Sequence, residues 1–268
     1  MNFKRIMSSI LGLPLVAFIL IYDNKYFLNI SFGIIAIIAI NEYFSAFSQK
    51  AKPIKWLGYL CAISIGFMHL IPKEYIIYAI ASSLPIILVI LFIQVIITNM
   101  KTTVEDAMIT FFGICYVIVF IMFIPLIRGL KHGGLIVWYP IITAWGTDVC
   151  AFVVGKTIGK HKFSKISPNK TIEGCIGGTI GAVILSLIFT FILNTYFQLN
   201  YSYILIALIS IVLSLIGQIG DFAASSIKRC VGIKDFSDLI PGHGGMLDRI
   251  DSIIFIAPFA YFLLLNLL

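Results

Sequence analysis

Residues 225–251 read SSIKRCVGIKDFSDLIPGHGGMLDRID and lie between two long apolar runs, at 201–220 and 252–268. The segment concentrates lysine, arginine, aspartate and histidine in a chain that is otherwise apolar. A loop that only joins two helices has little reason to collect both signs of charge. Carboxylates beside cations, next to membrane helices, indicate a site for phosphate groups and a metal ion.

The apolar runs on either side indicate the fold class. The 268 residues are 60% hydrophobic and 12% charged, with a mean hydropathy of +1.05, whereas about a quarter of the residues in a soluble domain are charged. Because a transmembrane helix needs roughly 20 mainly apolar residues, the sequence predicts an all-α polytopic integral membrane protein with about nine transmembrane helices. The expected spans are 6–22, 27–47, 54–71, 76–98, 107–128, 134–154, 174–194, 201–220 and 252–268.

The loops between these runs are mostly too short to fold alone. One transmembrane domain over residues 1–268 is therefore expected, with its active site at helix ends and cytoplasmic loops. Within it, residues 1–130 are a hydrophobic helical half, and residues 131–268 carry the charged segments.

Positive charge is distributed unevenly between the two sides of a nine-helix topology. Fifteen of the 19 lysines and arginines fall on the side that holds the amino terminus and both charged loops. By the positive-inside rule that side is cytoplasmic, in a cell inner membrane or plasma membrane, and the carboxyl terminus lies across it. The net charge of +7 then faces anionic lipids and metabolites. Nucleic acid is not an expected partner, because the charge is dispersed and no binding module accompanies it.

A lysine-rich segment runs from Asp148 to Gly178. Within it, Lys170, Thr171 and Glu173 precede a glycine-rich helix start, where backbone amides and the helix dipole accept anions. This arrangement indicates a loop that handles phosphate groups. The alternative is an anchor loop whose lysines only contact lipid head groups.

A second segment, GQIGDFAASSIKR, begins at Gly217. On a helix, Asp221, Ser225 and Lys228 share one face, because they are spaced at i, i+4 and i+7. A carboxylate at the end of a membrane helix is costly unless it is paired or coordinated, so Asp221 is a candidate functional residue. The alternative is a structural salt bridge from Asp221 to Lys228 or Arg229.

The glycine-rich PGHGGMLDRID surrounds His243 and ends with Asp248 and Asp251 at i, i+3. Glycines allow the backbone to approach phosphates closely. Magnesium takes oxygen ligands, usually one or two carboxylates with substrate phosphates and water, which makes Asp221 and Asp248 candidate ligands. Taken alone, a histidine such as His243 is more often a loop-capping or structural residue.

As an ordered set, these residues resemble the phosphatidate cytidylyltransferase family, also called CDP-diacylglycerol synthases. The family signature is similar to the run from Ser225 to Asp251 without a gap over 27 residues. Asp148, the SPNKTIEG segment at 167–174 and the Gly-Asp pair at 220–221 are also similar to family features, in the same order. The resemblance covers most of the carboxyl-terminal half, whereas the amino-terminal half agrees only in its hydrophobic helices.

Two positions depart from the family pattern. Many members have a second lysine where this chain has Asn169, and a glutamate where it has Ala224. One cation and one carboxylate of those members are thus absent, which bears on the detail of metal and phosphate coordination more than on the reaction class.

The resemblance implies nucleotidyl transfer in phospholipid biosynthesis. The phosphate of phosphatidic acid attacks the α-phosphorus of CTP, giving CDP-diacylglycerol and pyrophosphate, with Mg²⁺ and room for a second cation as the implied cofactors. The lipid phosphate is the nucleophile, so no nucleophilic side chain is required. The implied catalytic residues are Asp221, Asp248, Asp251, Lys228, Arg229 and Arg249, with Asp221 and Asp248 as metal ligands. The implied substrate-binding residues are Asp148, Lys170, Thr171, Glu173, Ser225, Lys234, Asp235, His243, Gly244 and Gly245.

Several alternatives stay open. An isoprenoid kinase or an archaeal-type ether-lipid cytidylyltransferase is also a membrane enzyme that uses CTP on a lipid, and the same residue types would suit it. A secondary transporter also has intramembrane carboxylates, although the charged segments are not repeated between the two halves. Glu42, in the second apolar run, either lines the lipid cavity or forms a helix-packing hydrogen bond. The expected partners are CTP, phosphatidic acid and membrane lipids, and a homodimer is left open.

Overall fold

The computed structural model describes residue 12 and residues 14–22, 24–164, 167–168 and 170–265. The chain divides into two compact units, which are described separately. The first unit comprises residues 1–125 and 230–249, and the second comprises residues 126–229 and 250–268. The charged segment 230–249 therefore packs with the amino-terminal helices, although it follows the second unit's helices in sequence.

The described residues contain helices and no β-strand, which confirms the all-α class. The helices before the unit boundary are α2 (Lys25–Ala46), α3 (Lys55–Phe67), the 3₁₀ turn η1 (Met68–Leu70), α4 (Lys73–Ile97), α5 (Val104–Gly113) and the π-helical turn η2 (Ile114–Val119). Helix α6 (Phe120–Arg128) crosses the boundary. The later helices are α7 (Gly133–Ile136), α8 (Trp138–Ile158), α9 (Ile172–Phe197), α10 (Tyr203–Cys230) and α11 (Leu247–Leu265).

The chain is a multi-pass membrane protein. Six described segments are long and apolar enough to cross a membrane: Lys25–Ala46, Lys73–Ile97, Val104–Arg128, Gly133–Ile158, Ile172–Phe197 and Tyr203–Cys230.

Three of the nine expected spans are not among these six segments. Helix α3 has 13 residues, about 20 Å at 1.5 Å per residue, which is short of the roughly 30 Å hydrocarbon core. Helix α11 carries Asp248, Arg249 and Asp251 within its 19 residues. The run at 6–22 is described only at residue 12 and from residue 14, and Asn169 also lies outside the described residues.

Local sequence explains how the first unit's helices begin. The Asn24 side chain accepts hydrogen bonds from the amides of Tyr26 and Phe27 at 2.9 and 3.1 Å, which caps α2. Helix α5 begins with a capping box, in which Thr103 and Asp106 each accept from the other's amide. Each cap satisfies amides that have no partner within their own helix.

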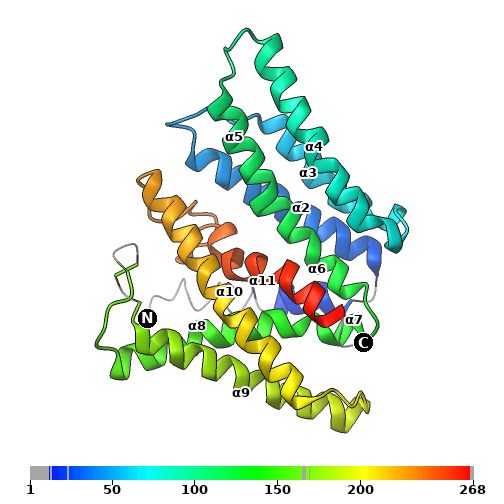
Figure 1. The fold of residues 1–268 in the computed structure, drawn as a ribbon, viewed down its shortest axis with the longest axis vertical. Helices are drawn as coiled ribbons and strands as arrows, with labels where there is room; N and C mark the ends of the chain where they lie inside the picture. The colour runs from blue at the N-terminus through cyan, green and yellow to red at the C-terminus, as the bar shows by residue number, and fades with distance from the viewer. Residues whose placement is uncertain (1–11, 13, 23, 165–166, 169, 266–268) are drawn as a thin grey trace. The chain divides into compact units, whose positions relative to one another are not determined.

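Small and hydroxyl-bearing residues pack the second unit. Helices α8 and α9 lie side by side along most of their length (Figure 1). A Cβ on Gly178 would lie 2.8 Å from the carbonyl oxygen of Thr147, so glycine permits this close approach. The Thr147 hydroxyl lies 2.8 Å from that of Ser214 on α10, and Gln218 donates to Thr179 at 3.0 Å. Polar groups of the three helices thus satisfy one another between apolar faces.

Candidate functional site

The lysine-rich segment and the end of α10 meet within the second unit. Lys170 forms an ion pair with Asp221, and each side chain is about one quarter exposed, at 26% and 27%. The Lys170 ammonium also lies 4.4 Å from the ring centroid of Phe222, which stacks on Phe163 at 4.8 Å. The sequence prediction that Lys170 and Asp221 contribute to one charged site is consistent with this contact, whereas the two phenylalanines were not foreseen.

Two more carboxyl groups and a second lysine lie near Asp221 and act on one another's charge. Asp251 is the residue just before the last expected span, and its pKa is raised to about 7 by burial and then by the Asp221 carboxylate. Asp148 on α8 adds to this effect, and Lys228 acts in the opposite direction. A carboxyl group among other carboxylates ionises less readily unless a cation compensates it. Three of the predicted acidic residues, Asp148, Asp221 and Asp251, therefore lie near one another in the second unit, together with the predicted lysines Lys170 and Lys228.

Glycines allow α10 and α11 to approach closely beside Asp221. A Cβ on Gly220 would lie 2.7 Å from the Cβ of Phe255 and 3.0 Å from the carbonyl oxygen of Asp251. A side chain at position 220 would thus displace the backbone that carries Asp251.

The loop before α9 folds back on itself. Phe163 N donates to the Lys170 carbonyl at 3.0 Å, and Ile172 N donates to the His161 carbonyl at 2.9 Å. The His161 ring lies 2.6 Å from the Glu173 carboxylate, and Thr171 accepts from the Gly174 amide at 3.1 Å. Thr171 and Glu173 therefore stabilise the loop, and Lys170 is the member of this group that contacts Asp221.

The first unit contains the glycine-rich part of the signature. A pocket of about 400 Å³ is lined by Lys234, Asp235, Asp238, Gly242, His243, Gly244 and Arg249. Gly242 and Gly244 have φ values of 79° and 80°, in the left-handed region that favours glycine. Ile240 N donates to the Gly244 carbonyl at 2.8 Å, which closes the turn around His243. Three basic and two acidic side chains therefore surround a polar pocket.

Asp248 is buried, with 7% of its surface exposed, and its carboxylate lies next to the pocket residue Gly244. Its Oδ2 accepts from the amides of Phe236 and Gly245, at 2.8 and 3.0 Å. Glu42, whose role the sequence left open, accepts three hydrogen bonds from the same segment. The helix-packing alternative for Glu42 thus has direct support.

The remaining predicted residues lie at the end of α10. Ser225 is partly exposed, and Arg229 is exposed in the last turn. Ala224, where many related sequences have glutamate, is fully buried. The helix predicted for this segment is confirmed.

The carboxylates of the second unit fit a hard cation. No three His, Cys, Asp or Glu side chains among the described residues are grouped so as to hold a metal ion. Magnesium, however, is commonly held by one or two carboxylates together with waters and phosphates. Asp221 and Asp251 interact electrostatically and offer such oxygen ligands. Asp248 belongs to the first unit, so its predicted pairing with Asp221 rests on sequence alone.

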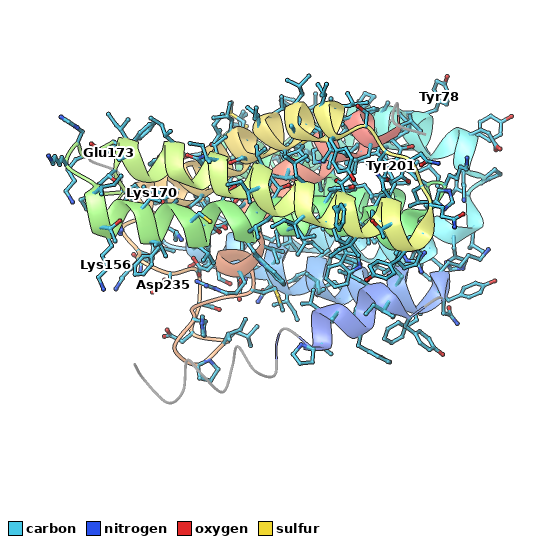
Figure 2. All side chains as sticks on the ribbon, turned by 90° about the horizontal axis from the view of Figure 1, so that it is seen from below. Tyr78, Lys156, Lys170, Glu173, Tyr201 and Asp235 are labelled. Carbon is cyan, nitrogen blue, oxygen red and sulfur yellow. The ribbon has the colours of Figure 1, made fainter. Side chains whose placement is uncertain are left out.

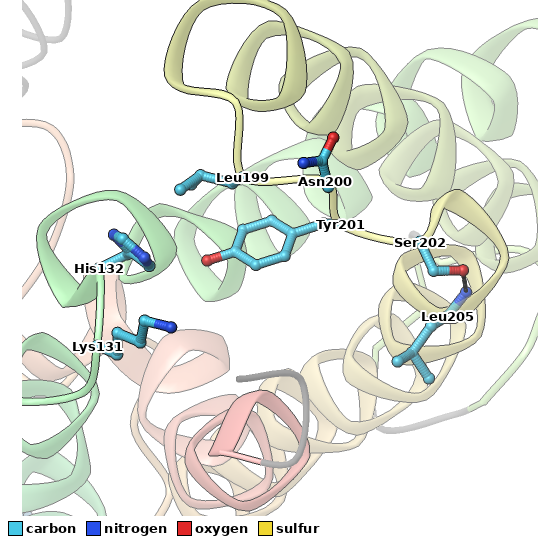
Figure 3. A pocket seen from close by; sticks show the side chains of 7 residues that line it. All are labelled: Lys131, His132, Leu199, Asn200, Tyr201, Ser202 and Leu205. Atoms are coloured by element: carbon cyan, nitrogen blue, oxygen red, sulfur yellow. Dashed lines mark hydrogen bonds between the residues drawn. The ribbon is translucent and has the colours of Figure 1, made fainter.

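A separate pocket of about 290 Å³ lies at the other end of the second unit, lined by Lys131, His132, Leu199, Asn200, Tyr201, Ser202 and Leu205 (Figure 3). Figure 2 shows Lys170 and Glu173 near one end of α9 and Tyr201 near the other. The 26 residues of α9 separate these ends by about 39 Å at 1.5 Å per residue. This pocket is therefore not part of the Lys170–Asp221 site.

Known proteins similar to this chain are consistent with these features. The model of the cytidylyltransferase family matches residues 3–267. The phosphatidate cytidylyltransferase of Bacillus subtilis (strain 168) is 35% identical over 271 residues, covering 97% of each chain. Those of Staphylococcus haemolyticus (strain JCSC1435) and Staphylococcus aureus (strain COL) are 39% and 40% identical over 163 and 162 residues, covering 60% of each chain. This chain therefore belongs to the cytidylyltransferase family of nucleotidyl-transferring enzymes.

Proposed function

We propose that this chain transfers CMP from CTP to phosphatidic acid, giving CDP-diacylglycerol and pyrophosphate. The observation that carries the proposal is the 35% identity to a phosphatidate cytidylyltransferase over 97% of both chains. CTP, phosphatidic acid and the surrounding membrane lipids are then its partners, and phospholipid biosynthesis is its role.

The proposed reaction brings two polyanionic substrates together. An oxygen of the lipid phosphate attacks the α-phosphorus of CTP, the bond to pyrophosphate breaks, and no side chain forms a covalent intermediate. Cationic side chains lower the repulsion between the two anions and stabilise charge on the leaving pyrophosphate. This role falls to Lys170, Lys228, Arg229 and Arg249. The Lys170 ammonium is paired with Asp221, so a substrate phosphate competes with that carboxylate for it.

Mg²⁺ is included in the proposal, held by Asp221 and Asp248 as the sequence predicts, with Asp251 close to Asp221. When bound, a divalent cation neutralises phosphate charge and stabilises the leaving group. A second cation belongs to the same proposal. The support is the oxygen chemistry of these carboxylates and the electrostatic interaction of Asp221 with Asp251.

The proposed topology has nine spans in a cell inner membrane or plasma membrane. It adds the runs at 6–22, 54–71 and 252–268 to the six helices that qualify by length and composition. In the run at 54–71, the 13 residues of α3 would cross only with a locally thinned bilayer or with flanking side chains that reach the interface. The amino terminus and the active site are cytoplasmic, which the asymmetric distribution of lysine and arginine supports. A homodimer is the assembly proposed, and light scattering on the detergent-purified protein tests it.

The decisive experiment uses purified protein in detergent with Mg²⁺, phosphatidic acid and CTP that is labelled at either the α- or the γ-phosphorus. The α label should enter the lipid, and the γ label should leave as pyrophosphate. Transfer of the γ label to lipid would indicate a lipid kinase instead. If neither label enters lipid while the protein is folded, the proposed function is wrong.

A further inference from the structure

Glu42 connects the amino-terminal helices to the signature segment. It lies near the end of α2 and is 5% exposed. Its Oε1 accepts from Ser237 Oγ at 2.6 Å and from Met246 N at 2.9 Å. Its Oε2 accepts from Leu247 N at 2.8 Å. All four residues belong to the first unit, so one buried carboxylate holds a segment that lies about 200 positions later in the chain.

The start of α11 requires an acceptor of this kind. Leu247 is the first residue of the helix, and the residue before it, Met246, has no side chain that caps a helix. The first amides of a helix have no partner within it, and the helix dipole favours a negative charge there. Glu42 supplies both the acceptor and the charge from a different helix. Its own burial is favourable only because these donors compensate it.

Gly245 leaves the space that the Glu42 carboxylate occupies. A Cβ on Gly245 would lie 2.6 Å from Oε2 and 2.7 Å from Cδ of Glu42. The carboxylate is fixed by three hydrogen bonds, so it cannot move aside without losing them. The glycine predicted to admit a phosphate therefore admits a carboxylate of the same chain.

Asp248 completes the arrangement. It accepts from the amides of Phe236 and Gly245, while Glu42 accepts from the next two amides. Three consecutive amides, at residues 245–247, are thus engaged by two buried carboxylates. These amides lie between the turn that carries His243 and the pocket residue Arg249, both of which line the 400 Å³ pocket.

We infer that Glu42 is a positioning residue for the proposed cytidylyl transfer. Glu42 does not line the pocket; it fixes the segment 236–249, and through that segment it fixes the pocket residues His243 and Arg249. The inference rests on the proposed function, since it assigns the polar pocket to the anionic nucleotide. The sequence left Glu42 with two alternatives, the lipid cavity or a helix-packing hydrogen bond, and neither connected it to the signature segment.

Replacement of Glu42 by glutamine is the informative change. A carboxylate accepts from all three donors, whereas glutamine offers one oxygen and one NH₂ group. In either orientation of the glutamine amide, its NH₂ faces the N–H of Met246 or of Leu247. A buried amide without an acceptor is costly, so Glu42→Gln should loosen the start of α11 even though the side chain keeps its size.

The test combines hydrogen exchange with kinetics on the full-length protein in detergent. In Glu42→Gln, whichever of the Met246 and Leu247 amides faces the glutamine NH₂ should exchange roughly 10- to 100-fold faster, the range expected for the loss of one charge-assisted hydrogen bond. The kcat/KM for CTP should fall by a similar factor, roughly 10- to 100-fold. The KM for phosphatidic acid should stay within about twofold of the wild-type value. General destabilisation would instead change the KM for CTP and the KM for phosphatidic acid alike.

Two further variants keep the inference testable. Glu74→Gln makes the same change at an exposed position in the first turn of α4 and should alter neither exchange nor kinetics. If Glu42→Gln does not purify as a folded protein, Gly245→Ala decides, because its Cβ displaces the Glu42 carboxylate and should accelerate exchange at Leu247.

Each outcome bears on a different statement. If the amides at the start of α11 exchange in Glu42→Gln as slowly as in the wild type, the Glu42 inference is wrong. The same holds for Gly245→Ala where that variant is the one tested. The proposed function would stand in either case, provided that the wild type is active. Equal changes in the KM for CTP and in the KM for phosphatidic acid would also overturn the Glu42 inference. A wild type that transfers no CMP would remove the proposed function first, and the positioning role with it.

Discussion

Replacing Lys170 by methionine tests the charged site most directly, because Lys170 forms the ion pair with Asp221. The change removes the ammonium and keeps a flexible side chain of similar length. The Asp251 carboxyl group then lies near the unpaired Asp221 carboxylate, with Lys228 as the cation whose charge acts on Asp251. We expect lower activity, because the phosphates of both substrates also meet one cation fewer.

The size of the effect is that of the charge pair that Lys170 would make with a substrate phosphate in place of Asp221. Two unit charges about 4 Å apart interact by about 4 kcal/mol at an effective dielectric constant of about 20. Each side chain is about one quarter exposed, at 26% and 27%, so solvent screening lowers this, and we take about half. The resulting ~2 kcal/mol corresponds to a loss of roughly 30-fold in kcat/KM. Lys170→Arg keeps the charge and should lose only a few-fold.

Incorporation of α-labelled CMP into lipid measures the effect, with Lys156→Met as the matched control. Lys156 lies on the last turn of α8 and is exposed, and its ammonium lies 5.9 Å from the centroid of the Phe152 ring. Combined with Asp221→Asn in a double variant, Lys170→Met should lower kcat/KM by less than the product of the two single fold-losses, since the two side chains act as a pair. Activity of Lys170→Met within threefold of wild type, or strictly additive losses, would refute the reasoning.

Three further predictions follow from individual contacts. Asp248→Asn keeps an oxygen that can accept from the two amides bound by Asp248 but loses the negative charge. Turnover measured across a magnesium titration should therefore fall by roughly 100-fold or more while the protein stays folded. Near-normal turnover would remove Asp248 from the proposed ligands. Gly220→Ala would bring a Cβ within 2.7 Å of Phe255, and the overpacking should cost about 1–3 kcal/mol, seen as a lower Tm; an unchanged Tm would contradict it. Cysteines introduced near Lys162 and Lys234 should react with an impermeant reagent from the cytoplasmic face only, and labelling from opposite faces would rule out the proposed topology.

Composition and periodicity predict the helices well, because an apolar run of membrane length has few alternatives to a helix. The partner of Asp221 is a different case. The sequence offered Lys228 or Arg229 as salt-bridge partners, and the structure pairs Asp221 with Lys170, 51 positions earlier. Helical spacing relates residues three or four apart, whereas this contact depends on how the loop before α9 folds back. No periodic pattern carries that information.

The contact of Glu42 with the signature segment was also beyond prediction, although two signals point to it together. Helix α11 begins after a methionine that cannot cap it, and a lone glutamate lies in an apolar run. An uncapped helix start and an unpaired carboxylate each need a partner. Their pairing across about 200 residues became evident only from the packing.

Several backbone amides at the two helix starts are less available to a phosphate than the glycine-rich sequence suggests. At the start of α9, the amides of Ile172 and Gly174 are engaged by a carbonyl and by the Thr171 hydroxyl. At the start of α11, Glu42 engages the amides of Met246 and Leu247. An amide that already donates to a buried acceptor has little to gain from a phosphate oxygen. In the proposed reaction, the positive charge that the two polyanionic substrates meet would then come mainly from side chains such as Lys170, Lys228 and Arg249.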